Sequence, residues 1–187
     1  FVVTFLVNAI RLLNQAIADC ETKIAEHFAK HPDAELFSSF PGAGKTMAPR
    51  LAAAFGTDRQ RFHNAKEVQQ YSGIAPITKS SGKSVVVHMR WACPKFLRQT
   101  FHEFAGHSIR FSDWAMAYSE MRKAKGHPHQ EIVRGLAFKW QRIIFDCWQN
   151  RTPYDEARYL RSLDRKNAPL LKFLPKSGAN PPTPLDT

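Results

Sequence analysis

The chain of 187 residues is 43% hydrophobic and 12% aromatic, which allows one folded domain with appendages and excludes wholesale disorder. Its 27 Lys and Arg outnumber its 16 Asp and Glu, for a net charge of +11. No run of 18 apolar residues and no signal-peptide pattern is visible, so we expect no membrane span and no membrane partner. Because the first residue is Phe1 rather than Met, we expect a fragment that continues upstream.

The positive charge is concentrated in one part of the chain. Residues 41–110 carry 11 basic and 3 acidic side chains, a net charge of +8, whereas residues 1–40 have a net charge of −2. Such clustering favours a polyanionic partner, most often nucleic acid, over a protein that is merely basic. The three cysteines show no CxxC spacing, which favours reduced thiols in an intracellular protein.

Residues 1–33 predict one long coiled-coil-type helix. No Pro or Gly interrupts residues 1–31, and His31-Pro32-Asp33 ends the helix. The spacing 4-3-4-3-4 of a heptad seam is kept by Leu6, Ile10, Leu13, Ile17, Cys20 and Ile24. Two partners for this seam stay open: another helix, supplied in trans or from upstream, or the chain's own domain.

The segment 36–56 predicts a helix-hairpin-helix element around a Pro-Gly-x-Gly turn. A P-loop is a competing interpretation of Gly44-Lys45-Thr46, but its first glycine would fall at Ser39. In the favoured interpretation Thr46 caps the second helix, Pro49 is tolerated in its first turn, and backbone N–H groups can face a phosphate. The candidate DNA contacts are Gly42, Gly44, Lys45, Thr46 and Arg50. A plain connector between two helices is the alternative.

The remaining sequence predicts a mainly α fold with at most a short β element near 84–88. A short helix begins at the N-cap Asn64, and the non-helical loop 74–91 follows it. The strongest apolar helix, over 129–150, is expected to be central. The expected parts are a helix over 1–33, a domain over 34–166 whose helical core covers 94–166, and a flexible Pro-rich tail over 167–187.

The loop 74–91, IAPITKSSGKSVVVHMRW, places two hydroxyl groups among cations. A serine can attack a phosphodiester if cations stabilise the charge that develops at phosphorus and another group takes its proton. The candidate residues are the serines Ser80 and Ser81 with Lys79, Lys83, His88 and Arg90. An ordinary Ser-Ser-Gly turn with solvated charges is the alternative, and on the residues alone it is the more common one.

Other chemistry has little support in the sequence. Glu67 and Glu103 are the only acidic residues between Arg59 and Arg110, whereas a two-metal centre needs several convergent carboxylates. The Gly-x-Ser-x-Gly pattern of serine hydrolases is absent. The sequence therefore offers a serine in a cationic loop and no metal site of its own.

The motifs in their order resemble a known family. They are the heptad helix, the F-P-G-x-G turn of residues 40–44, the stretch Tyr71 to Pro76, the Ser-Gly loop, the Lys-x-Leu-Arg of residues 95–98, and Arg151 to Asp155. This order, from about residue 10 to residue 156, resembles the C-terminal transposase domain of insertion-sequence transposases. These enzymes pair a RuvC-like DEDD domain with a serine-bearing domain, and the Piv-type DNA invertases belong with them.

The resemblance implies DNA transposition or site-specific recombination by a cytoplasmic, bacterial-type protein. It makes Ser81, which directly precedes Gly82, the nucleophile, with Ser80 as the ambiguous neighbour. The partners that it implies are transposon-end and target DNA, a guide RNA in some members, and further copies of the chain through the N-terminal helix. It implies no cofactor in this chain, because the acidic residues that bind Mg²⁺ in the family lie in the upstream domain.

One departure from the family's pattern follows the loop glycine. Many relatives have dense Lys and Arg there, whereas this chain has the more apolar KSVVVHMRWACPK. We expect Val85 to Val87 to form a buried strand. The alternative function is a non-catalytic helical module that grips DNA or RNA, in which the serines only turn the chain.

Overall fold

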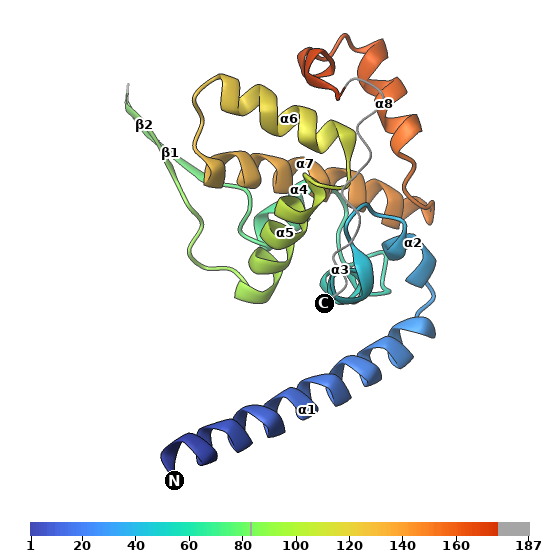
Figure 1. Ribbon diagram of the computed structural model, residues 1–187. Helices are drawn as coiled ribbons and strands as arrows, with labels where there is room; N and C mark the ends of the chain where they lie inside the picture. Colours follow the sequence, from blue (N-terminus) through green and yellow to red (C-terminus); the bar gives the residue numbers. More distant parts are fainter. Residues whose placement is uncertain (83, 176–187) are drawn as a thin grey trace.

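The computed structural model describes residues 1–82 and 84–175 and is mainly helical, as the sequence predicts. The described residues form eight α-helices and a single antiparallel pair of strands (Figure 1). The elements are α1 Val2–Ala29, α2 Ala34–Ser38, α3 Gly44–Phe55, α4 Ala65–Tyr71, β1 Ile77–Ser81, β2 Ser84–His88, α5 Lys95–Ser108, α6 Asp113–Ala124, α7 His129–Asn150, α8 Glu156–Arg165 and the 3₁₀ helix η1 Pro169–Phe173.

The core is built around α7, which confirms the expected central helix. Helices α4, α5 and α6 all pack against it. Trp140, Ile144 and Trp148 of α7 are fully buried. The rings of Trp114 and Trp140 lie 4.7 Å apart, and Trp148 donates a 2.9 Å hydrogen bond from Nε1 to the carbonyl of Gly56. Aromatic packing with satisfied indole N–H groups therefore joins the elements.

The predicted start of α4 is confirmed, and the predicted start of α3 is wrong. The side chain of Asn64 accepts a 3.1 Å hydrogen bond from the Glu67 N–H, as an N-cap residue does. Helix α3, in contrast, begins at Gly44 with Ala43 as its N-cap residue. Thr46 therefore lies inside the first turn and caps nothing, and Pro49 lies beyond that turn. The sequence favoured Thr46 as the N-cap residue because of its hydroxyl group, but the helix already begins at Gly44.

Helix α1 projects from the body as a rod and buries none of its residues (Figure 1). Only its C-terminal end reaches the core, through Phe28 beside α3. By length and composition this helix could also cross a membrane, whereas no span is expected from the sequence. That test alone is weak, because core helices of soluble proteins and signal sequences pass it too.

Strands β1 and β2 form a hairpin that extends away from the helices (Figure 1). The expected burial of its apolar run is wrong, since Val85, Val86 and Val87 are 64%, 47% and 62% exposed. Among the described residues no helix covers a face of this two-stranded sheet, so its valines have no core to pack against.

The beginning of the expected tail is ordered. Residues 169–173 form η1, which packs against α6 and buries Leu170. The prediction of a flexible segment from residue 167 is therefore wrong for this part. Residues 176–187, with the remaining prolines of the tail, lie outside the described residues.

Candidate nucleic-acid interface and serine hairpin

The register of the hairpin separates the two candidate serines. Ser81 pairs with Ser84, and Ser80 pairs with Val85. Because paired residues share a face and successive residues alternate, Ser81 lies on one face with Lys79 and Val86. Ser80 lies on the opposite face. Both serines are exposed. The two hydroxyls therefore face different sides and are not interchangeable in reaching one phosphate.

His88 shares the face of Ser81 but lies at the other end of the strand. It pairs with Ile77, four residues along β2 from Ser84. At the usual rise per residue of a strand this separation is about 13 Å. Such a distance excludes direct proton transfer between the two side chains within one hairpin. The described part of the hairpin therefore brings a cation, Lys79, near Ser81 but no proton acceptor. Lys83 lies outside the described residues.

Arg98 of α5 fixes the base of the hairpin. Its guanidinium donates hydrogen bonds to the carbonyl oxygens of Arg90 and Trp91 and contacts the thiol of Cys93. Arg90 itself is partly buried, and its Nε has no hydrogen-bond partner. The predicted contact Arg90 thus lies at the root of the hairpin, far along the strand from Ser81.

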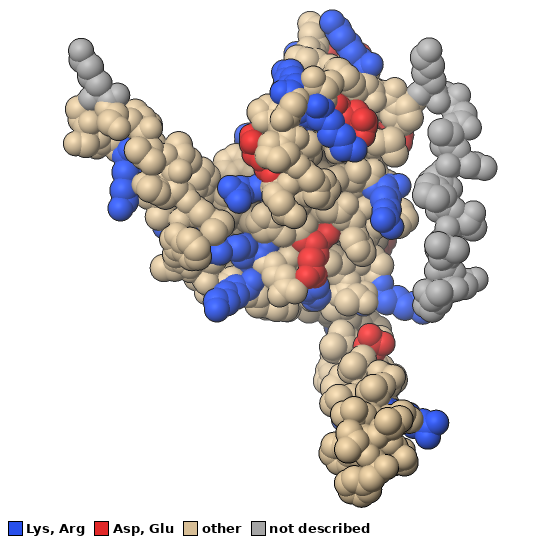
Figure 2. Space-filling model, turned by 60° about the vertical axis from the view of Figure 1, so that its left-hand side comes forward, with Lys and Arg blue, Asp and Glu red and all other residues tan. Residues whose placement is uncertain are grey.

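A set of basic groups continues from the hairpin onto α5 and α7. Burial lowers the pKa of His102, and the nearby charges of Arg134 and Arg98 lower it further, which favours the neutral form of this imidazole. Figure 2 shows Lys and Arg side chains on the hairpin and where it leaves the body. Sequence reasoning missed Arg98 and Arg134, which lie on helices outside the loop. For Arg98 the signal was the stretch from Val68 to His102, which has no acidic residue and extends beyond the loop, whereas Arg134 lies outside that stretch.

The turn between α2 and α3 holds the other predicted contacts. Gly42 has φ +76°, and a Cβ atom there would come within 2.8 Å of the Phe111 ring, so packing inside the protein explains this glycine. Gly44 has φ +52° with open space around it. Gly44, Lys45 and Thr46 are all exposed at the start of α3. The first turn of a helix has free N–H groups, which can bind an anion there.

Arg50, the last of the predicted contacts, is engaged inside the protein. It forms an ion pair with Glu103 of α5, and its guanidinium lies 5.7 Å from the centre of the Phe96 ring. Its side chain is only 21% exposed. Arg50 therefore links α3 to α5. Unlike the exposed residues 44–46, it already has a partner inside the protein.

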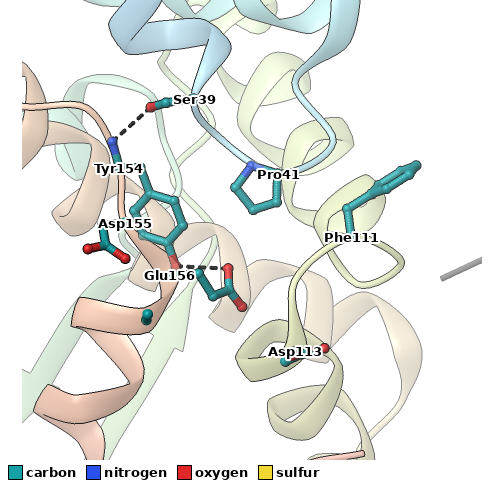
Figure 3. Close-up of a pocket in the computed structure, with 8 residues that line it drawn as sticks. Ser39, Pro41, Phe111, Asp113, Tyr154, Asp155 and Glu156 are labelled. Atoms are coloured by element: carbon teal, nitrogen blue, oxygen red, sulfur yellow. Dashed lines mark hydrogen bonds between the residues drawn. The ribbon is translucent and has the colours of Figure 1, made fainter. Parts of the chain in front are cut away.

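A cavity of about 450 Å³ beside the same turn is acidic (Figure 3). Asp113, Asp155 and Glu156 line it together with Ser39, whose hydroxyl accepts a 2.8 Å hydrogen bond from the Tyr154 N–H. Three carboxyl groups repel a phosphate backbone, so this cavity is not part of a nucleic-acid interface. Among the residues that the structure describes, no group of three or more His, Cys, Asp or Glu could hold a metal ion.

The chain is similar in sequence to proteins of insertion elements. Residues 34–120 match the family model described as Transposase IS116/IS110/IS902 family. The IS117 mini-circle protein of Streptomyces coelicolor, which bears a provisional transposase name, is 32% identical over 143 residues, 76% of this chain and 34% of that protein. An uncharacterized 42 kDa protein of insertion element IS900 from Mycobacterium paratuberculosis is 27% identical over 158 residues, 83% of this chain and 39% of that protein.

The third relative is the uncharacterized 43.6 kDa protein of IS110 from Streptomyces coelicolor, which is 25% identical over 155 residues, 82% of this chain and 38% of that protein. The chain spans about a third of the length of these relatives. The match over 34–120 runs from α2 into α6 and so includes both the α2–α3 turn and the hairpin. Through these residues the chain carries a domain similar to the transposases of the IS116/IS110/IS902 family.

Proposed function

We propose that the chain is the C-terminal part of an insertion-element DNA transposase or site-specific recombinase, which binds DNA and supplies Ser81 as the nucleophile for strand cleavage and exchange. The family match over 34–120 supports the class of activity. The observation that carries the assignment of the residue is the hairpin, where Ser81 is exposed on the face of Lys79. The residues from Val68 to His102 contain no acidic side chain that would repel a phosphate.

The proposed step exchanges one phosphate ester for another. The Ser81 oxygen forms a bond to a DNA phosphorus, and the bond from that phosphorus to a deoxyribose oxygen breaks. The departing oxygen takes up a proton, and the serine proton passes to a base outside the hairpin. Lys79 stabilises the negative charge that develops on the phosphate oxygens. The same ester bond stores the energy of the broken strand for rejoining.

The proposed activity needs a second domain. We expect Mg²⁺ to be bound by acidic residues of a DEDD domain that this sequence does not contain. The described residues do not fit such an ion, since they offer no cluster of ligands. We therefore derive no step through a metal and assign only nucleophile and DNA contacts to this chain.

The proposed DNA grip has two parts. The exposed start of α3, with Gly44, Lys45 and Thr46, presents backbone N–H groups and one cation to a phosphate. Lys79 on the hairpin adds a charge beside the nucleophile. Such contacts position a protein on DNA without choosing a sequence. This is the helix-hairpin-helix role that we propose for α2 and α3, and a guide RNA would supply the sequence choice.

The test compares two neighbouring serines in the full-length protein that contains this chain. Ser81→Ala should lower the recombination rate by about 10³-fold or more, because the covalent nucleophile is lost, while its DNA affinity stays unchanged. Ser80→Ala is the matched control, because the same hydroxyl is lost on the opposite face of the same strand. Recombination and affinity are measured with the element's own ends and target.

The outcomes separate the proposal from its alternative. If Ser81→Ala recombines as the parent does and Ser80→Ala does not, the nucleophile is Ser80, on the other face of the hairpin. Unchanged recombination by both variants would leave a non-catalytic binding module that grips DNA or RNA. The chain of 187 residues alone should bind DNA without joining it, and strand transfer by this chain alone would contradict the need for a second domain.

A further inference from the structure

One large aromatic side chain is exposed without a structural reason. Trp91, which follows β2, is 80% exposed, whereas Trp114, Trp140 and Trp148 are completely buried. Burying a large apolar side chain stabilises a fold, and this indole does not contribute in that way. Phe96, at the start of α5, is also 48% exposed. The segment from β2 to α5 therefore presents aromatic faces to its surroundings.

The backbone that carries Trp91 is held in place although its ring is free. Arg98 binds the carbonyl oxygens of Arg90 and Trp91, and it contacts Cys93 on the same segment. Cys93 in turn lies against Gly73, where a Cβ atom would come within 2.5 Å of the thiol sulfur. The backbone at Trp91 is thus held by Arg98 of α5, and the neighbouring Cys93 packs against Gly73, which follows α4. A rigid aromatic loses little entropy when a flat ligand stacks on it.

The surroundings of Trp91 are cationic. The residues from Val68 to His102 include His88, Arg90, Lys95 and Arg98 and no Asp or Glu. A second copy of the chain would bring the same positive segment to a two-fold interface, where like charges repel. A nucleic-acid strand brings negative phosphates and flat bases together, and it therefore matches both properties of this surface.

We propose that Trp91 is a stacking platform for an unpaired nucleotide of a single-stranded DNA or RNA segment at the base of the serine hairpin. This inference rests on the proposed function, because it takes the hairpin side as the nucleic-acid face. In a duplex both faces of each base are covered by neighbours, so an exposed indole can stack only on a base that has left the stack. The basic side chains beside Trp91 bind the adjacent phosphates.

The fold provides a direct spectroscopic test. Because the other three tryptophans are buried, external quenching of intrinsic fluorescence reports on Trp91. The full chain is titrated with a dT oligonucleotide, the matching rU oligonucleotide, and a duplex of equal length at one salt concentration. We expect quenching by single strands and much less by the duplex. Comparing the affinities for the dT and rU oligonucleotides shows whether single-stranded DNA or RNA is preferred.

Two substitutions and a control complete the test. Trp91→Ala should weaken binding of the preferred single strand by about 10-fold, within the range for one base–aromatic stack, and Trp91→Phe should restore part of it. Phe173→Ala, an exposed aromatic on η1, should bind as the parent does. Each variant is checked by circular dichroism and by ultracentrifugation, where its mass should equal that of the parent chain.

The remaining outcomes overturn the inference in distinguishable ways. If the parent chain binds no nucleic acid, the proposed function fails as well. If the parent binds but neither quenching nor the Trp91 variants show an effect, only the stacking platform fails. If Trp91 is shielded from acrylamide before any oligonucleotide is added and Trp91→Ala dissociates an oligomer, the surface belongs to a contact between copies.

Discussion

Gly73 is the residue at which the hairpin segment meets the helical body. Its φ is +74°, which disfavours any side chain, and a Cβ atom there would also meet Cys93 Sγ at 2.5 Å and its Cβ at 2.8 Å. Gly73→Ala should therefore lower the free energy of unfolding through both strain and overpacking. We expect a loss larger by about 1–3 kcal/mol than strain alone would give, measured by urea denaturation.

The control for this substitution is another glycine with the same backbone and no crowding. Gly126 has φ +79°, and nothing lies within 4 Å of a Cβ atom built there. Gly126→Ala should cost only the strain of the left-handed conformation, about 1–2 kcal/mol. Equal losses at the two sites would mean that Cys93 moves aside freely and that Gly73 does not fix the hairpin base.

Single residues show where sequence reasoning succeeds. Asn64 could be identified as an N-cap because its partner Glu67 lies three residues away. Arg50 could not be separated from a DNA contact, because its ion-pair partner Glu103 lies 53 residues further along the chain. The same limit applies to Ser80 and Ser81. Which face each serine occupies depends on strand register, and the sequence alone predicted only a turn.

At the scale of elements, a half-buried carboxyl group connects α8 to α6. Glu156 accepts a 2.8 Å hydrogen bond from the Ser112 hydroxyl and one of 3.2 Å from the Tyr154 hydroxyl, beside the N-terminus of α6 (Figure 3). Burial raises the pKa of Glu156 above its usual 4.5, which outweighs these hydrogen bonds. The charged form is thus less favourable in the folded state than in the unfolded chain.

The sign of this pKa shift fixes a pH dependence. The contribution of Glu156 to stability is fully present below pH 4.5 and is lost as the pH rises through the raised folded pKa. Glu156→Gln cannot titrate, so the unfolding free energy of the parent should fall relative to this variant as the pH rises above 4.5. Urea denaturation of both proteins over a pH series measures the difference. A difference that is constant with pH would contradict the raised pKa.

The helices could be predicted from the sequence better than the strands. A nearby cap predicted the start of α4 at Asn64, and periodic apolar residues predicted α7 over 129–150, because these signals are local. The valine run predicted β structure correctly but its burial wrongly, since burial depends on whether another element covers the strand. Only the three-dimensional arrangement shows that the hairpin lies outside the helical core.

At the scale of the whole molecule, α1 is an apolar rod without a partner in the described chain. Its seam residues Leu13 and Ile17 are 61% and 55% exposed, and Figure 2 shows few charges on this projection. We propose that the seam pairs copies of the chain. Ile17→Asp should therefore shift the mass towards the monomer, as measured by analytical ultracentrifugation.

An apolar residue of the same helix, outside the seam, serves as control. Leu12 is 73% exposed and lies one position from the heptad pattern. Leu12→Asp introduces the same charge into the same helix, outside the seam, and should leave the oligomer intact. Equal dissociation by both variants would show that the copies associate through nonspecific apolar contacts of α1 and not through the heptad seam.

The exposed hairpin also has a consequence for timing. A two-stranded hairpin without a covering layer is only marginally stable in water, and this one buries none of its valines. The segment that carries Ser81 therefore opens and closes more readily than the core around α7. A nucleic-acid strand seated on the hairpin would stabilise its closed form. The reactive hydroxyl would then take up a fixed position only while its substrate is present, which protects other phosphodiesters from stray attack.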